Sequence, residues 1–309
     1  MAEFRLIDAI VAVFDQLEAA PAVVLGPGDD AAILRVPAGT EVVASIDTLV
    51  AERHFPATAL PQQIGYRALM VAASDLAAMA AEPGYATVAL TLDTPDREWV
   101  CDLAAGIAEA AEVIGLPVVG GNLARGPLAL TISVQGYVPV GTALRRDGGR
   151  PGDRVLVSGP LGGSAAAVRT GAVAATGASL SPVQRAYFRP LARLDLRTLL
   201  RGQASAGLDV SDGLLQDLDH LCRASAVGAE VRRSALPLTA GAQLEDALGA
   251  SDDYELCFTV PAAVPDAPFL AAGCTVIGEL TAALGIRLDG EPVAPETGYD
   301  HFVATGAAS

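Results

Sequence analysis

Gly26-Pro27-Gly28-Asp29-Asp30 is the stretch around which the sequence is organised. Its two glycines flank a proline and favour a tight turn, because glycine tolerates a positive φ and the proline ring fixes its own φ. The turn ends in two adjacent carboxylates, which repel each other unless a positive charge lies beside them. Taken alone, such a turn is typical of a solvated acidic loop.

Four more acidic turns or strand ends change this interpretation. They are Ser45-Ile46-Asp47, Ser74-Asp75, Asp209-Val210-Ser211-Asp212 and Asp252-Asp253. No excess of basic residues accompanies them. Carboxylates gathered in this way indicate a site for hard cations such as Mg²⁺, which prefer oxygen ligands.

The composition excludes several classes of partner. The chain has 309 residues, of which 51% are hydrophobic and 18% charged, so it can form one large or two ordinary domains with a sizeable core. Its net charge of -16 argues against nucleic-acid and anionic-membrane partners, which need a basic surface. The four cysteines have no metal-ligand spacing, and we expect buried thiols. Without a secretion signal or a long apolar run, we expect a cytoplasmic protein.

The sequence contains no lysine, and all 20 basic residues are arginine. This absence excludes the P-loop lysine, the protein-kinase strand lysine and Schiff-base chemistry. Any phosphate bound by this chain must therefore contact arginine, backbone N–H groups or metal ions.

Helical and strand patterns alternate along the chain and predict an α/β or α+β fold. Gly120-Gly121-Asn122 is expected to end the strand before it. The turn-rich stretch 139–152 is the best candidate boundary, between domains 1–140 and 141–309. The expected helices are 4–19, 61–81, 95–114, 164–171, 181–202 and 211–224, and the expected strands are 41–46, 85–92, 116–119, 128–137, 153–158, 204–210, 228–232, 254–260 and 274–278.

Several candidate residues also have an ordinary structural interpretation. Asp75 lies on an apolar helical face, as either an edge residue near solvent or a metal ligand. Asp209 and Asp212 stand at a strand-to-helix junction, where each can cap the helix or hold a metal ion near bound phosphate. Arg146 is a solvated arginine or a phosphate contact. His54 is a structural loop histidine or a ligand-binding residue.

Taken together, the motifs resemble the thiamine-monophosphate kinase family over nearly the whole chain. Each motif is modest alone, but their order over the full length is specific. The motifs are Gly26-Pro27-Gly28-Asp29-Asp30-Ala31-Ala32, Asp47-Thr48-Leu49-Val50 with His54-Phe55, Ser74-Asp75-Leu76-Ala77-Ala78-Met79, Arg125-Gly126-Pro127-Leu128, Arg150-Pro151-Gly152-Asp153, Asp209-Val210-Ser211-Asp212-Gly213-Leu214, Asp253-Tyr254-Glu255-Leu256 and Gly298-Tyr299-Asp300-His301-Phe302.

The resemblance implies a two-domain, aminoimidazole-ribonucleotide-synthetase-like fold. Its N-terminal α/β domain pairs with that of a second copy to form a barrel across a homodimer, and a C-terminal α/β domain packs alongside. The implied activity is direct, Mg²⁺-dependent transfer of the ATP γ-phosphoryl group to thiamine monophosphate, which gives thiamine diphosphate. Because both reactants are anionic, several Mg²⁺ ions on a carboxylate cage would neutralise their repulsion, and no covalent nucleophile is needed.

The site residues follow from the resemblance, position by position. The implied metal positions are Asp30, Ser45, Ile46, Asp47, Asp75, Asn122, Asp209 and Asp212. The implied nucleotide contacts are Gly121, Asn122, Arg146 and Ser211. The implied thiamine contacts are His54, Asp252 and Tyr299.

Three departures from the family pattern accompany the match. Gly120-Gly121-Asn122-Leu123 stands where the family usually has Gly-Gly-Asp-Thr, and Ile46 stands where it usually has Thr. Both fall on one expected metal position, so we hypothesise that one Mg²⁺ is bound weakly or not at all. Unchanged Mg²⁺ dependence in an Asn122→Asp variant would count against this. Ala250-Ser251-Asp252-Asp253 replaces Gly-Gly-Glu-Asp, which shortens a substrate contact by one methylene.

Three other functions stay open from the sequence alone. One is a related synthetase of the same fold, although no cysteine or lysine suited to selenium chemistry lies near the N-terminus. Another is a non-catalytic or altered-specificity paralogue that binds nucleotide or thiamine phosphate, which Ile46, Asn122 and Leu123 favour. The weakest is a structural metal-binding protein, which leaves Arg146 and the glycine-rich turns unexplained.

Overall fold

The computed structural model describes residues 2–17, 21–94, 96–174 and 179–294, which divide between two compact units. The first unit lies within 1–143, 171–180 and 188–201, and the second within 144–170, 181–187 and 202–309. Two segments of the second half of the sequence, 171–180 and 188–201, therefore belong to the first unit. The division into domains 1–140 and 141–309 remains a prediction.

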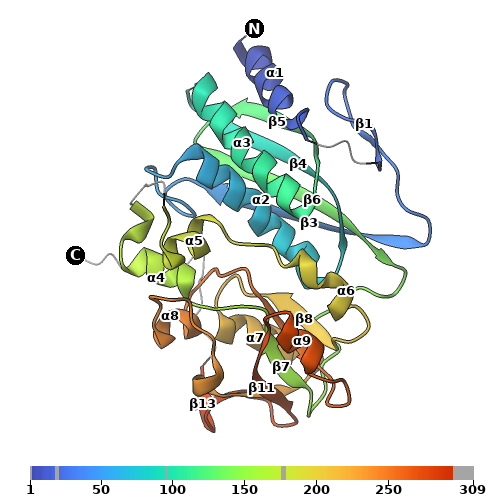
Figure 1. Ribbon diagram of the computed structural model, residues 1–309, viewed down its shortest axis with the longest axis vertical. Coiled ribbons are helices and arrows are strands. Elements are labelled where there is room, and N and C mark those ends of the chain that lie inside the picture. The colour runs from blue at the N-terminus through green and yellow to red at the C-terminus, as the bar shows by residue number, and fades with distance from the viewer. Residues whose placement is uncertain (1, 18–20, 95, 175–178, 295–309) are drawn as a thin grey trace. The chain divides into compact units, whose positions relative to one another are not determined.

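The first unit is built on a four-stranded sheet with helices on one face (Figure 1). α2 packs against α3 and against strands β3 and β6, while α1 packs against α3. In sheet order the strands are β3 (Thr40–Val50), β6 (Ala129–Pro139), β4 (Glu82–Leu92) and β5 (Val118–Arg125), with only β4 and β5 parallel. The helices are α1 (Ala2–Phe14), α2 (Pro61–Ala78) and α3 (Arg97–Ile114), and β1 (Val23–Leu25) pairs with β2 (Ile33–Leu34).

The sequence explains why the two long helices lie so close together. A Cβ on Gly65 of α2 would lie 2.1 Å from the Leu103 carbonyl oxygen of α3, so only glycine permits this approach. The carboxylate of Asp96 caps α3 by accepting the N–H groups of Glu98 and Trp99. Gly115 ends α3 in the left-handed conformation, with φ 66°. The resulting helix pair covers one face of the sheet, and the side chains of β3 on the opposite face are exposed.

Arginines attach the segment 188–201 to the first unit. Arg189 pairs with Glu109 of α3, and its guanidinium lies 3.8 Å from the centre of the Tyr66 ring. Arg197 pairs with Glu82 at the start of β4. These contacts explain why the segment groups with the first unit rather than with its sequence neighbours.

The second unit contains a seven-stranded sheet covered on one face by α7 (Leu214–Ser225), whose apolar side chains join the core (Figure 1). Strand β10 runs antiparallel to both β7 and β8, so the ends of β7 and β8 meet the start of β10 at one edge. In sheet order the strands are β13 (Glu291–Val293), β12 (Gly285–Leu288), β9 (Gly228–Val231), β11 (Thr275–Thr281), β7 (Arg154–Val157), β10 (Leu256–Val260) and β8 (Ala206–Asp209). The short helices of this unit include α4 (Gly163–Arg169), α8 (Leu244–Leu248) and α9 (Ala267–Ala271). Helix α6 (Arg197–Leu200) lies in the first unit, and α5 (Pro182–Phe188) ends where the segment 188–201 begins.

Several expected elements are wrong in extent. The helix expected over 4–19 ends at Phe14, and the strand expected over 41–46 continues as β3 to Val50. The helix expected over 181–202 is broken, because Pro190 lacks an N–H group and the chain continues as irregular backbone to α6. The strand expected to end before Gly120 instead continues as β5 to Arg125. The short strands β1, β2, β12 and β13 and helices α8 and α9 carry too few residues for their periodicity to be recognised.

Candidate functional site

The first group of candidate residues joins strand β3 to helix α2. Ser45 and Asp47 lie on the sheet face that α2 covers, and the Ser45 hydroxyl donates a hydrogen bond to Asp75. Burial, together with the negative charge of nearby Asp75, raises the pKa of Asp47 to about 6. The two carboxylates therefore lie close enough for their negative charges to repel each other.

The donor set of this group fits Mg²⁺. Ser45, Asp47 and Asp75 offer oxygen atoms only, which hard divalent cations prefer. Across the residues that the structure describes, however, no three His, Cys, Asp or Glu side chains are grouped so that they could hold a metal ion. A cluster of several ions therefore needs further oxygen ligands, of the kind that bound phosphate groups supply.

This geometry predicts a pH dependence of Mg²⁺ binding. Lowering the pH from 7.5 to 5 should weaken Mg²⁺ binding about tenfold, because a proton occupies Asp47 below its pKa of about 6. Without a cation, protonated Asp47 favours folding at low pH, and this contribution disappears as the pH rises through about 6. Calorimetric titration at both pH values measures the change in Mg²⁺ affinity. The Asp47→Asn variant should show no such change with pH. A binding constant that stays the same at both pH values would contradict the assignment.

A second group surrounds a cavity of about 600 Å³ within the first unit. Apolar side chains of α1 and α3 form much of its wall, and β5 forms another part. Gly121 and the turn 26–32 also border it, so the acidic turn that ends in Asp29 and Asp30 lies beside the glycines of β5. The polar side chains that line the cavity are Asp8, Asp29, Asp30, Thr87 and Asn122. An apolar cavity with a few polar groups is typical of a small-molecule site.

Strand order separates two residues that the sequence places at one metal position. Ile46 lies on β3 and Asn122 on β5, with β6 and β4 between them. Three strand spacings amount to about 14 Å, so within one copy these side chains cannot bind the same ion. Ile46 is 63% exposed and points away from the face that carries Ser45 and Asp47. The shared position of Ile46 and Asn122 is therefore wrong for a single copy of the sheet.

The third group lies at the sheet edge of the second unit where β8 ends. Asp209 is the last residue of β8 and is buried, while Ser211 and Asp212 in the following turn are half-buried. The Val210 N–H group donates to the Glu255 carbonyl oxygen at 2.7 Å, and the Tyr254 N–H group donates to the Val210 carbonyl oxygen at 2.8 Å. Residues 209–212 and 252–255 are thus neighbours, although the sequence separates them by some 40 positions.

Neither predicted aspartate is the N-cap residue of α7, which is Gly213 at φ 125°. Instead, Asp217 in the first turn of α7 accepts the N–H groups of Ser211, Asp212 and Gly213, each at 3.0 Å. These three donors are therefore unavailable to a phosphate. Sequence reasoning missed Asp217, although an acid in the first turn of a helix is a recognisable signal.

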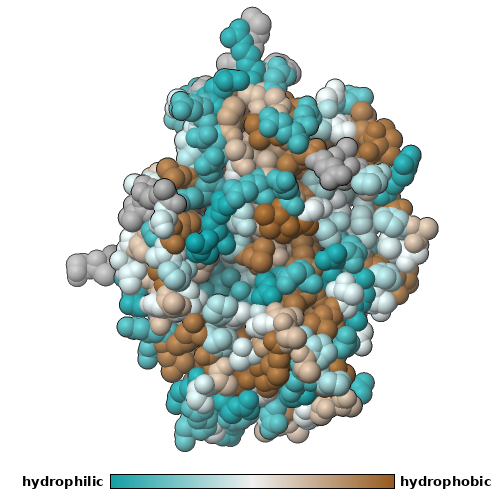
Figure 2. Space-filling view, in the orientation of Figure 1, coloured by the Kyte–Doolittle hydropathy of each residue, from teal (hydrophilic) through white to brown (hydrophobic). Residues whose placement is uncertain are grey.

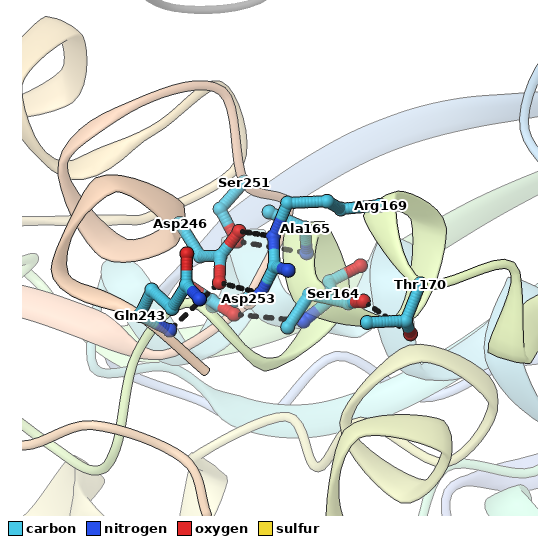
Figure 3. A network of polar contacts seen from close by, with 9 residues as sticks. Ser164, Ala165, Arg169, Thr170, Gln243, Asp246, Ser251 and Asp253 are labelled. Carbon is cyan, nitrogen blue, oxygen red and sulfur yellow. Dashed lines mark hydrogen bonds and ion pairs between the residues drawn. The ribbon is translucent and has the colours of Figure 1, made fainter. Parts of the chain in front are cut away.

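The segment 251–253 is held to the start of α4, as Figure 3 shows. Asp253 accepts the Gly162 N–H group at 2.7 Å, and the N–H group of Ala165 donates to the Ser251 hydroxyl at 3.4 Å. Burial raises the pKa of Asp253 to about 6. The Ser164 hydroxyl donates to Asp252, the predicted thiamine contact. Asp252 therefore already has a polar partner within its own unit.

An ion pair supports the same helix from its other end. Arg169 donates to both carboxylate oxygens of Asp246 at 2.7 Å, and these bonds lower the pKa of Asp246 (Figure 3). The pair ties α4 to α8. Because segment 251–253 follows α8 closely in the chain, the ion pair also helps to hold this segment against α4.

The remaining predicted residues have simpler surroundings. The Arg146 side chain is exposed, and its carbonyl oxygen accepts a hydrogen bond from Ser225 at 2.7 Å. His54 accepts the Val50 N–H group at Nδ1, 3.0 Å away, so this nitrogen carries no proton in that bond. Tyr299 lies outside the residues that the structure describes.

Hydrophilic and apolar side chains are mixed on the molecular surface, over the face drawn in Figure 2. In the described part of the chain, no helix combines the length and the hydropathy needed to cross a bilayer.

Comparison with known proteins identifies the family. Residues 28–138 match AIR synthase related protein, N-terminal domain, and residues 150–290 match AIR synthase related protein, C-terminal domain. The chain is 39% identical over 300 residues to the thiamine-monophosphate kinase of Salmonella typhimurium strain LT2. The aligned part covers 90% of this chain and 91% of that protein. This chain belongs to the thiamine-monophosphate kinase family.

Solved structures of thiamine-monophosphate kinases have the same fold. The enzyme of Stenotrophomonas maltophilia K279a is 37% identical, with a TM-score of 0.86 over 95% of this chain and 98% of that one. AaThiL complexed with AMPPCP and TMP is 28% identical, with a TM-score of 0.79 over 97% of both chains. The fold class and the family expected from the motifs are confirmed.

Proposed function

We propose that this protein transfers the γ-phosphoryl group of ATP to thiamine monophosphate, giving thiamine diphosphate and ADP. Its place in the thiamine-monophosphate kinase family carries the proposal, and the AaThiL complex with AMPPCP and TMP supports it, since AMPPCP is an analogue of ATP. The acidic groups of both units fit a reaction whose reactants are both phosphorylated. ATP is a cytoplasmic metabolite, so we place the reaction in the cytoplasm.

The chemistry needs positioning and charge neutralisation rather than a nucleophilic side chain. A phosphate oxygen of thiamine monophosphate forms the new bond to the γ-phosphorus while the bond to the β-phosphate oxygen of ATP breaks. This acceptor is already ionised near neutral pH, so no general base is required. Bound Mg²⁺ would neutralise the phosphate charges and polarise the transferring group.

The side chains divide this work between them. Asp47 and Asp75 would hold Mg²⁺, with Ser45 orienting Asp75 through its hydrogen bond. Asp209 and Asp212 offer carboxylates from the second unit. The proposed roles of Asp30 and Asn122 as further metal ligands, of Arg146, Ser211 and Gly121 as nucleotide contacts, and of His54, Asp252 and Tyr299 as thiamine contacts follow the family pattern.

The cavity beside β5 suits the nucleoside part of ATP. Its apolar wall would take the base, while Asp29 and Asp30 lie on the turn where a metal-bound phosphate chain would begin. His54 and Asp252, the proposed thiamine contacts, do not line it. The two substrates would therefore occupy different places.

A homodimer would resolve the separation of Ile46 from Asn122. Strands β3 and β5 are the two edges of the four-stranded sheet, and exposed edges readily pair with another chain. If β3 of one copy lies beside β5 of a second, two sheets close into a barrel and Ile46 comes near Asn122 of the second copy. The hypothesis of a weakened or missing Mg²⁺ then applies at the dimer contact.

The dimer predicts a difference between two surface valines. Val42 is 50% exposed on the helix-free face of β3, and Val113 is 55% exposed on α3. Val42→Asp should convert a dimer into a monomer in sedimentation experiments, because it would bury a charge in the barrel, whereas Val113→Asp should remain dimeric. A wild-type protein that sediments as a monomer at micromolar concentration would overturn the dimer.

The proposed activity is tested with purified protein, ATP, Mg²⁺ and thiamine monophosphate. Chromatography should detect thiamine diphosphate and ADP in equal amounts. Binding of both substrates without product would favour the non-catalytic paralogue. A protein that binds neither substrate would contradict the proposed function altogether.

A further inference from the structure

We infer that Asp217 is a positioning residue for the metal-binding turn 210–213, an inference that rests on the proposed function. One oxygen of this carboxylate, Oδ2, accepts three successive N–H groups, those of Ser211, Asp212 and Gly213, each at 3.0 Å. Two of these three residues carry side chains that the proposed function assigns to metal and nucleotide. The backbone of the turn is therefore fixed by one buried group.

Asp217 is buried, and its hydrogen bonds go to the backbone of the turn. Its side chain is only 5% exposed, and no ion pair to it occurs among the described residues. A buried carboxylate is costly unless hydrogen bonds compensate it, and here the backbone N–H groups of the turn provide that compensation. The same bonds hold Gly213 at φ 125°, where a Cβ would lie 2.1 Å from the Gly249 carbonyl oxygen.

Fixing the backbone of the turn fixes the ligand oxygens that it carries. Groups that orient a metal ligand affect metal affinity about 10-fold to 100-fold, even when they do not touch the ion. Asp217 acts in this way on Ser211 and Asp212 through their own N–H groups. Its loss should therefore weaken Mg²⁺ binding and slow transfer while leaving the fold of the unit in place.

The same helix offers a matched control. Asp219, two residues further along α7, is 8% exposed and forms an ion pair with Arg223 at 2.6 Å. It is nearly as buried as Asp217, but its ion pair lies within the helix rather than on the turn. A variant at Asp219 therefore reports the cost of removing a buried acid from α7 without releasing residues 211–213.

The test compares Asp217→Ala, Asp217→Asn and Asp219→Ala at a temperature at which circular dichroism shows all three folded. Mg²⁺ binding is titrated calorimetrically with AMPPCP present, and kcat and KM are measured separately. Asp217→Ala should raise the apparent Mg²⁺ dissociation constant at least about tenfold and lower kcat more than it changes the KM for thiamine monophosphate. Asp217→Asn should lose less Mg²⁺ affinity and less kcat than Asp217→Ala, because its amide oxygen still accepts hydrogen bonds. Asp219→Ala should stay within about twofold of wild type in both quantities.

Hydrogen exchange shows whether the turn is released independently of any change in Mg²⁺ binding. The amides of 211–213 should exchange faster in Asp217→Ala than in Asp219→Ala, because they lose their acceptor. Faster exchange with unchanged Mg²⁺ binding would overturn the positioning role. Equal Mg²⁺ binding in Asp217→Ala and Asp219→Ala would overturn it as well. If Asp217→Ala does not fold, the comparison of Asp217→Asn with wild type decides by the same criteria. A wild-type protein that binds no AMPPCP would instead contradict the proposed function.

Discussion

Replacing Asp47 with asparagine is expected to lower kcat/KM for thiamine monophosphate at least about 1,000-fold, which corresponds to about 4 kcal/mol of transition-state stabilisation. Asp47 lies beside Asp75, and its pKa of about 6 leaves it ionised and able to bind a cation at pH 7.5. Asparagine keeps one oxygen but removes the charge that would balance Mg²⁺. Steady-state kinetics at saturating Mg²⁺ measure the effect.

A matched variant separates local from general effects of charge. Asp102→Asn removes one negative charge from an exposed position on α3 and should leave kcat/KM within about twofold of wild type. Unfolding midpoints show whether either variant has lost its fold. Retention of most activity by Asp47→Asn would exclude the pair formed by Asp47 and Asp75 from the reaction.

Gly121→Ala is expected to destabilise the first unit by about 3 kcal/mol or more, the largest stability effect that we predict. A Cβ at this position would lie 2.0 Å from the Val88 carbonyl oxygen on β4, which is backbone and cannot move aside. Gly120 lies next to it on β5, yet a Cβ there meets no atom within 4 Å. Gly120→Ala should therefore change stability by no more than about 1 kcal/mol.

Urea unfolding of both variants measures this difference. Gly121→Ala should shift the midpoint to much lower urea, while Gly120→Ala stays close to wild type. Equal urea midpoints for the two variants would show that a Cβ at position 121 does not meet the Val88 carbonyl oxygen. The comparison also distinguishes a structural need for glycine at position 121 from a need of the nucleotide.

The sequence predicted the elements whose periodicity is long and regular. Helices α2 and α3 and strand β6 each carry an apolar face over at least 11 residues, and all three were expected near their observed bounds. Strand β3 was expected only over 41–46 and continues to Val50. Gly120-Gly121 misled the prediction of β5, because glycines usually interrupt a strand. Here one of them is needed for close pairing with β4, a contact that no local pattern reveals.

The candidate site was predictable where its residues are local and not where they are distant. The family resemblance gave Ser45, Asp47 and Asp75 as metal positions, and these residues lie on β3 and α2, which pack against each other. Asp217 and Ser164 were missed, because their partners are backbone N–H groups or side chains fixed only by tertiary structure. Strand order likewise could not be read from the sequence, so the distance between Ile46 and Asn122 was unforeseen.

A crystal structure of the protein with Mn²⁺, AMPPCP and thiamine monophosphate tests the central claim most directly, because Mn²⁺ replaces Mg²⁺ and scatters X-rays anomalously. One anomalous peak should lie within about 2.5 Å of carboxylate oxygens of Asp47 and Asp75, and another within the same distance of Asp212. The phosphate chain of AMPPCP should contact at least one of these ions. Mn²⁺ bound only elsewhere, with Asp47, Asp75 and Asp212 in contact with water alone, would contradict it.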